Sequence, residues 1–167
     1  MAQPYTSPVE RGFIRIGRVA GVELRLHVIA VLGVVLFGLV TGHPLVGVGL
    51  FTILVVHEAG HALLARQVGL VVVEIDVSLV GGVCRCRGST TPCAESVIAW
   101  GGLLAQLLFG LTALALRFAI AAIDETPAGD FIAAWCLPSF VLAVINLLPL
   151  PRLDGAKAWR VFRCKHA

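Results

Sequence analysis

Long apolar stretches separated by short polar segments dominate the chain. No Lys, Arg, Asp or Glu occurs between Arg25 and Glu58, residues 94–122 hold one basic residue, Arg117, and residues 131–150 hold no charge. A helix that crosses a bilayer needs about 20 predominantly apolar residues. The pattern therefore predicts four transmembrane helices, over about residues 22–40, 45–66, 94–122 and 131–150.

The first two predicted spans share one charge-free stretch, which is interrupted by the turn signal TGHP at residues 41–44. Two spans fit only if the second continues through the segment HEAGH, at 57–61, to about Arg66. The alternative is one span followed by a surface helix. Because residues 45–65 are otherwise continuously apolar, we expect two spans, with the polar cluster inside the membrane.

Two segments alternate between apolar and polar residues, which is the pattern of a strand rather than a helix. One is VVVEIDVSLVGGVCRCRG, within the predicted loop 68–92, and the other is GFIRIGRVAGVELRLH at 12–27, expected to be a strand or hairpin. The predicted fold is an all-α polytopic membrane protein with a small membrane-associated β-strand region. We divide the chain into an N-terminal segment (1–21), a membrane core (22–160) and a basic tail (161–167).

The composition agrees with a single membrane domain. Hydrophobic residues make up 58% of the 167 residues and charged residues 14%, against about 25% in an ordinary soluble domain. A soluble chain of this size could not bury so much apolar surface. These values exclude a disordered chain, a coiled coil and a nucleic-acid-binding module, so no nucleic-acid partner is expected.

The basic residues indicate which side each loop faces. All thirteen Lys and Arg residues except Arg117 lie in residues 1–25, in the 66–93 region or in the chain after residue 150. Cytoplasmic loops carry an excess of Lys and Arg, so both termini and the strand region are expected in the cytoplasm. The five cysteines are odd in number and scattered, which argues against a disulfide framework. We expect Cys84, Cys86 and Cys93 to be free thiols.

The segment His57-Glu58-Ala59-Gly60-His61 fits the pattern H-E-x-x-H. Residues four apart share one face of a helix, so both imidazoles can bind one zinc ion and Glu58 can accept a proton from zinc-bound water. Ionisable groups are costly in hydrocarbon and need a partner or a function. The alternative from these residues alone is a helix end at the interface, or a hydrogen-bonded His/Glu pair between helices.

A catalytic zinc ion needs a third protein ligand and an open position. Asp154 follows the segment NLLPLPRL, whose prolines end the last predicted span, so the chain can turn back toward the histidines. Asp124, Glu125 and Asp130 lie on the opposite side of the membrane. The alternative for Asp154 is a solvated residue in an Asp-Gly turn.

HEAGH on one membrane helix and NLLPLPRLDG after a later one together resemble the site-2 protease family, peptidase family M50, of intramembrane zinc metalloproteases. Three further stretches resemble the same family: GRVAGVELRLHVIAV, DVSLVGGVCR and AWGGLLAQLLFG. The resemblance covers most of residues 12–160, without a PDZ or CBS domain. It implies an intramembrane metalloprotease core in residues 22–160 of a multi-pass protein, in a bacterial cell membrane.

The resemblance also implies roles for eight residues. The ligands of one zinc ion per chain would be His57, His61 and Asp154, and the general base would be Glu58. The substrate would be a membrane-spanning protein, cleaved within the lipid bilayer. The residues expected to contact it are Asn146, Gln106, Gly81 and Gly82.

Two residues depart from the family pattern, because Gln106 stands where the family has Asn and Gly102 stands where it has Pro. Gln106 could instead make a hydrogen bond between helices. The chain ends soon after LDGAKAWR, as expected of a minimal core or a truncated chain. Two other functions stay open: a catalytically inactive relative that binds membrane proteins and, less favoured, a metal-binding transporter.

Overall fold

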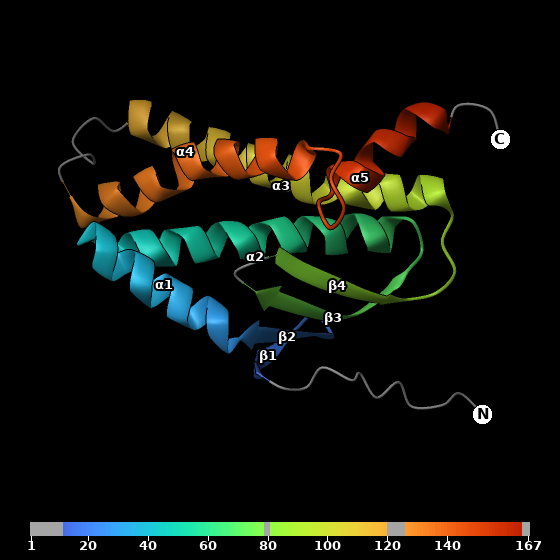
Figure 1. Ribbon diagram of the computed structural model, residues 1–167, viewed down its shortest axis with the longest axis horizontal. Helices are drawn as coiled ribbons and strands as arrows, with labels where there is room; N and C mark the ends of the chain where they lie inside the picture. The colour runs from blue at the N-terminus through green and yellow to red at the C-terminus, as the bar shows by residue number, and fades with distance from the viewer. Residues whose placement is uncertain (1–11, 79–80, 120–125, 165–167) are drawn as a thin grey trace.

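The computed structural model describes residues 12–78, 81–119 and 126–164. α2 runs through the middle of the molecule, with α3 and α4 along one side and α1 and the sheet along the other (Figure 1). The elements in chain order are β1 (Phe13–Val19), β2 (Val22–His27), α1 (Val28–Thr41), α2 (Pro44–Gln67), β3 (Val71–Ser78), β4 (Gly81–Arg87), α3 (Pro92–Ala119), α4 (Pro127–Leu147), α5 (Gly155–Ala158) and the 3-10 helix η2 (Trp159–Arg163).

Within the described ranges, three helices are long and apolar enough to cross a membrane: α2, α3 and α4. The first predicted span, 22–40, is only partly helical, because residues 22–27 form β2. α1 has 14 residues and is about 21 Å long, shorter than the roughly 30 Å apolar core of a bilayer. The expected count of four transmembrane helices is therefore not established. Residues 120–122 of the third predicted span lie outside the described residues.

The central helix α2 approaches α3 most closely where both carry glycine. A Cβ on Gly60 would lie 2.3 Å from the carbonyl oxygen of Gly101, and a Cβ on Gly101 would lie 2.5 Å from that of Gly60. Helices in lipid associate through close packing of such small residues, since lipid supplies no hydrophobic driving force between them. The contact holds the HEAGH turn of α2 directly against α3.

The four strands form one sheet in the order β1-β2-β3-β4, which confirms the predicted N-terminal hairpin and the strand region after α2. β1 pairs with β2 and β3 with β4 in antiparallel fashion, whereas β2 and β3 are parallel. Because β2 precedes α1 and β3 follows α2, the parallel pair brings the start of α1 close to the end of α2. β4 is an outer strand and packs alongside α2.

A cluster of charged side chains joins β2, β3 and β4. Arg25 pairs with Glu74 and with Asp76, at 2.7 Å from Nε to Oδ1 of the latter. Arg85 pairs with the same two carboxylates, at 3.0 Å to Glu74 and 2.9 Å to Asp76. Burial alone would raise the pKa of Asp76, but hydrogen bonds from the two arginines lower it. The arginines therefore keep this buried carboxylate ionised and tie β4 to the rest of the sheet.

The chain after α4 returns along α3, where Cys164 forms a disulfide with Cys93 at the start of that helix. The expectation that Cys93 is a free thiol is therefore wrong. A pairing across 71 residues depends on the path of the chain after α4, which no local pattern predicts. Cys84 and Cys86 are free, as expected.

Candidate metal centre

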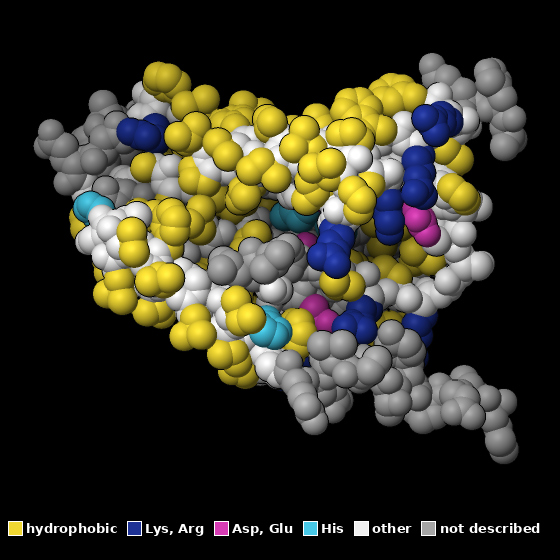
Figure 2. Space-filling view, viewed as in Figure 1, with side chains coloured by type: hydrophobic (Ala, Val, Ile, Leu, Met, Phe, Trp, Pro, Cys, Tyr) yellow, Lys and Arg dark blue, Asp and Glu magenta, His cyan; other side chains and the backbone are white. Residues whose placement is uncertain are grey.

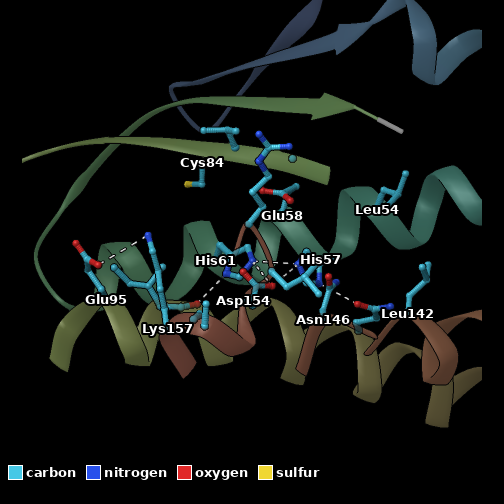
Figure 3. A pocket seen from close by; sticks show the side chains of 18 of the residues that line it. Leu54, His57, Glu58, His61, Cys84, Glu95, Leu142, Asn146, Asp154 and Lys157 are labelled. Atoms are coloured by element: carbon cyan, nitrogen blue, oxygen red, sulfur yellow. Dashed lines mark hydrogen bonds and ion pairs between the residues drawn. The ribbon is translucent and has the colours of Figure 1, made fainter. Parts of the chain in front are cut away.

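Two histidines one turn apart on α2 share a buried site. His57 and His61 are 7% and 8% exposed, and their Nε2 atoms lie 3.1 Å apart. Figure 3 shows both rings on the face of α2 that meets α3 and the C-terminal segment. The i, i+4 spacing therefore brings the two nitrogens together as the sequence predicts.

Asp154 reaches the same point from a distant part of the chain. α4 ends at Leu147, and the chain turns back through the two prolines. Asp154 Oδ2 then lies 2.9 Å from His57 Nε2 and 3.2 Å from His61 Nε2. Glycine at 155 permits this turn, because a Cβ on Gly155 would lie 2.3 Å from the carbonyl oxygen of Leu147.

The short helix after Asp154 is anchored to α3 by two hydrogen bonds. The hydroxyl of Ser96 and the indole N–H of Trp100 both donate to the carbonyl oxygen of Ala158, at 2.8 Å and 3.1 Å. Ser96 and Ala158 are fully buried. Sequence reasoning missed both donors, because no spacing rule links residues about 60 positions apart and Trp100 resembles an ordinary packing residue.

The three donor atoms form a nearly equilateral triangle with sides of 2.9, 3.1 and 3.2 Å. Tetrahedral zinc holds nitrogen and oxygen ligands at about 2.0–2.2 Å, which separates neighbouring ligand atoms by about 3.3 Å. Two imidazoles and one carboxylate are also a donor set that catalytic zinc accepts. This group of three donor side chains, found in the described part of the chain, therefore fits a zinc ion.

The charge state of Asp154 favours a cation. Burial alone would raise its pKa, but hydrogen bonds with His57 and His61 hold the pKa well below the ordinary value. Metal ligands must be deprotonated, and this carboxylate meets that condition. Burial raises the pKa of the Cys84 thiol, which lines the same cavity but is not part of the group formed by His57, His61 and Asp154.

Glu58 lies beside the histidines and against β4. It is 4% exposed, and its carboxylate accepts a hydrogen bond from the backbone N–H of Gly82. A Cβ on Gly82 would lie 2.1 Å from the carboxyl carbon of Glu58. Gly82, which the sequence suggested as a substrate contact, is thus also the residue whose missing side chain makes room for Glu58.

The second nitrogen of each imidazole faces α3. His61 Nδ1 lies 2.8 Å from the carbonyl oxygen of Ile98. His57 Nδ1 lies 2.8 Å from Gln106 Oε1, and Gln106 Nε2 donates to the carbonyl oxygen of Ser139 at 3.0 Å. Gln106 therefore makes the hydrogen bond between helices that was left open as an alternative.

These groups line a cavity of about 620 Å³ between α2, β4, α3 and the C-terminal segment. Of the predicted substrate contacts, Asn146, Gln106 and Gly82 line it, and Gly81 is the first residue of β4. Figure 2 shows the hollow in the middle of one face, with His and acidic side chains in its depth and Lys and Arg along one side. The basic residues of the lining are Arg152, Lys157 and Arg160.

Comparison with known proteins identifies the family of the chain. The Peptidase M50B-like family matches residues 28–150, most of the chain. Two relatives, both named "Putative zinc metalloprotease Rip3" and found in the Erdman and H37Rv strains of Mycobacterium tuberculosis, are 34% identical over 91% of this chain and 44% of their own length. The chain therefore spans less than half the length of these relatives.

A solved structure has a similar fold. The Site-2 Protease from Methanocaldococcus jannaschii matches with a TM-score of 0.69 over 92% of this chain and 73% of that chain, at 21% identity. At such identity the likeness concerns the fold alone. Together with the family match and the membrane-length helices, it leads to one conclusion. The chain is a multi-pass membrane protein that belongs to the Peptidase M50B-like family of site-2-protease-like zinc metalloproteases.

Proposed function

We propose that this protein is a zinc-dependent endopeptidase that cleaves membrane-spanning proteins within the lipid bilayer. The observation that carries the proposal is the proximity of three metal-ligating atoms and Glu58 in one buried cavity on a membrane-length helix. The family and the name of its relatives, zinc metalloprotease, support the reaction class.

The proposed ligands of one zinc ion per chain are His57, His61 and Asp154. A zinc ion held there would polarise the scissile carbonyl and acidify water. Glu58 would accept a proton from the attacking water and deliver it to the leaving amine. The hydrogen bond from Gly82 N–H supports this role, because it holds the carboxylate at the wall of the cavity.

The proposed substrate binds in an extended form beside β4. A transmembrane helix must unwind before its peptide bonds are accessible, and the freed backbone groups then need hydrogen-bond partners. Among the described strands, β4 pairs with β3 alone, so its other edge can accept an added strand. Gly81 and Gly82 would be the strand contacts nearest to Glu58, and Asn146 would contact the substrate from α4.

The proposed orientation has both termini and the sheet in the cytoplasm of a bacterial cell. The positive-inside rule supports it, since the basic side of the cavity carries Arg152, Lys157 and Arg160. Water would enter the cavity from that side. Residues 22–160 would then form the intramembrane metalloprotease core, with 1–21 as a cytoplasmic N-terminal segment and 161–167 as a basic tail.

The experiment that tests this function uses the purified chain in proteoliposomes with a single-span model substrate tagged at both ends. We expect the wild type to cut the substrate, and Glu58→Gln to retain zinc but cut at least about 100-fold more slowly, because the general base is lost. Glu95→Gln changes another carboxylate of the cavity lining and should cut at the wild-type rate. Wild-type cleavage by Glu58→Gln contradicts the mechanism, and zinc binding without any cleavage favours the inactive relative.

A further inference from the structure

One face of α3 contacts both histidines of the candidate metal centre. Ile98, Gly102 and Gln106 are spaced four residues apart, so they form a single stripe along the helix. Ile98 contributes its backbone carbonyl to His61, and Gln106 contributes its side-chain amide to His57. Ile98 and Gln106 therefore contact the Nδ1 atoms of the two rings, whereas the Nε2 atoms lie beside Asp154.

Hydrogen-bond chemistry fixes the direction of the contact between Gln106 and His57. The carbonyl oxygen of Ser139 can only accept, so the amide atom of Gln106 that faces it must be the NH₂ group. The amide oxygen then faces His57 Nδ1, and since that oxygen can only accept, Nδ1 must carry the proton. In the neutral imidazole that a metal ion would bind, Nε2 is then the nitrogen with the lone pair, whereas without a metal ion the same nitrogen donates a hydrogen bond to Asp154. That nitrogen is the one beside Asp154.

Gly102 brings the stripe close to both rings. A Cβ on Gly102 would lie 2.5 Å from His61 Nε2 and 2.8 Å from His57 Cε1. Any side chain there would displace the imidazoles, so α3 confines them from one side. The two residues that depart from the family pattern, Gly102 and Gln106, thus contact the same pair of histidines.

We propose that Gln106 is a positioning residue for the metal ligand His57, rather than a contact for the substrate. It holds the ring in one orientation and one tautomer, with Nε2 available to the metal, as outer-shell partners of metal-binding histidines do. Gln106 is 1% exposed, and both ends of its amide are engaged by the protein. The inference rests on the proposed metal centre but not on proteolysis.

The length of the side chain matters to this role. Gln106 spans from α3 to His57 on α2 and to Ser139 on α4. An Asn side chain is shorter by one carbon–carbon bond, about 1.5 Å, and cannot keep both hydrogen bonds at their present lengths. Glu has the same length as Gln and keeps an oxygen that can accept from Nδ1, but it cannot donate to Ser139.

The test measures zinc affinity of the full chain in detergent by competition with a chromophoric chelator, and the visible spectrum with Co²⁺ bound. We expect Gln106→Leu to bind zinc about 10–100-fold more weakly, with a changed cobalt spectrum. Gln106→Glu should restore zinc affinity to within about threefold of the wild type, because the acceptor for Nδ1 is kept. Should Gln106→Leu fail to fold, Gln106→Asn makes the same test and is expected to weaken zinc binding.

The matched control is Ser139→Ala. The hydroxyl of Ser139 has no hydrogen-bond partner among the described residues, and its backbone carbonyl survives the change, so zinc affinity should not alter. If Gln106 only joined α3 to α4, Gln106→Glu would lower the thermal midpoint most, and no variant would change zinc affinity. That outcome overturns the inference. A wild-type chain that binds no zinc overturns the metal centre itself, which separates the two failures.

Discussion

Glu58 is an ionisable residue buried within a membrane-length helix. Ionisable groups within a membrane are costly unless they are paired or used in function. Glu58 has a backbone donor from Gly82 and lies next to His57 in the chain, and no basic side chain among the described residues forms an ion pair with it. A buried carboxylate held by one N–H and facing a cavity suits proton transfer better than structural pairing.

Gly82 provides the prediction at this scale. We expect Gly82→Ala to reduce cleavage at least about 100-fold while zinc stays bound, because the added methyl group would lie 2.1 Å from the Glu58 carboxyl carbon and displace the general base. Zinc content and cleavage of the model substrate measure both effects. Val83→Ala is the control, since Val83 is 56% exposed on the same strand. If both variants lost cleavage activity equally, the cause would be a disturbance of β4 as a whole rather than displacement of Glu58.

The sequence predicts some site residues and not others for a geometric reason. His57 and His61 follow from helix periodicity, which is local, and the approach of Asp154 follows from prolines that end a helix. The hydrogen bond from His57 to Gln106 depends on how α3 is rotated about its own axis relative to α2. No residue pattern within either helix predicts that rotation. The close contact of Gly82 with Glu58 is hidden for the same reason.

At the scale of elements, β4 supplies the backbone that packs against Glu58 and the edge at which we propose that the substrate binds. β4 is joined to β3 by backbone pairing and by the ion pairs of Arg85 with Glu74 and Asp76. Asp76 is 2% exposed and is the more buried of the two carboxylates shared by Arg25 and Arg85. Removing one member of such a buried cluster leaves the other charges unpaired. The free energy of unfolding then falls by more than the intact cluster contributes to it.

We therefore expect Asp76→Asn to lower the free energy of unfolding by about 3 kcal/mol. This value is the low end of the range for a buried pair, because the Arg85 side chain is 24% exposed. The thermal midpoints of the wild type and Asp76→Asn, compared across pH, measure this loss of stability. The pKa of Asp76 is lowered by folding, so the difference is full above its ordinary value of 3.8 and decreases as the pH falls toward the lowered pKa. Glu23→Gln, in the partly exposed pair with Arg15, is the control and should change stability by less than about 1 kcal/mol. A difference that persists at low pH contradicts the role of ionised Asp76.

Most elements are predictable from the chain, and the exceptions involve distant segments. The hairpin at 12–27 and the strands after α2 follow from alternation, and α2, α3 and α4 follow from apolar length. The predicted span at 22–40 starts too early, because residues 22–27 alternate between apolar and polar side chains and form β2, which pairs with β1 and β3. The Cys93–Cys164 bridge needs the return path of the C-terminal segment.

At the scale of the whole molecule, the sides of the membrane on which the two termini lie depend on whether α1 crosses the bilayer. The parallel pairing of β2 with β3 brings the start of α1 and the end of α2 to the same sheet. If α2 crosses the membrane, α1 together with β2 has to bring the chain across in the other direction. α1 is about 21 Å long, so the bilayer must thin or β2 must enter it.

We accordingly predict four crossings, with both termini on the cytoplasmic side. A fluorescent protein that folds only in the cytoplasm should be active when fused to either end, and an enzyme active only outside should be active when fused after Thr126, at the start of α4. Opposite sides for the two termini would contradict a crossing by α1.

The measurement that tests the account most directly is the zinc content of the purified chain, because His57, His61 and Asp154 meet only in the folded protein. We predict about one zinc per chain in the wild type and in Glu58→Gln, and little or none in His57→Ala and Asp154→Ala. Glu95→Gln, at the edge of the same cavity, should retain zinc. A wild-type chain without zinc, or an Asp154→Ala variant that binds zinc as the wild type does, would contradict the proposed metal centre.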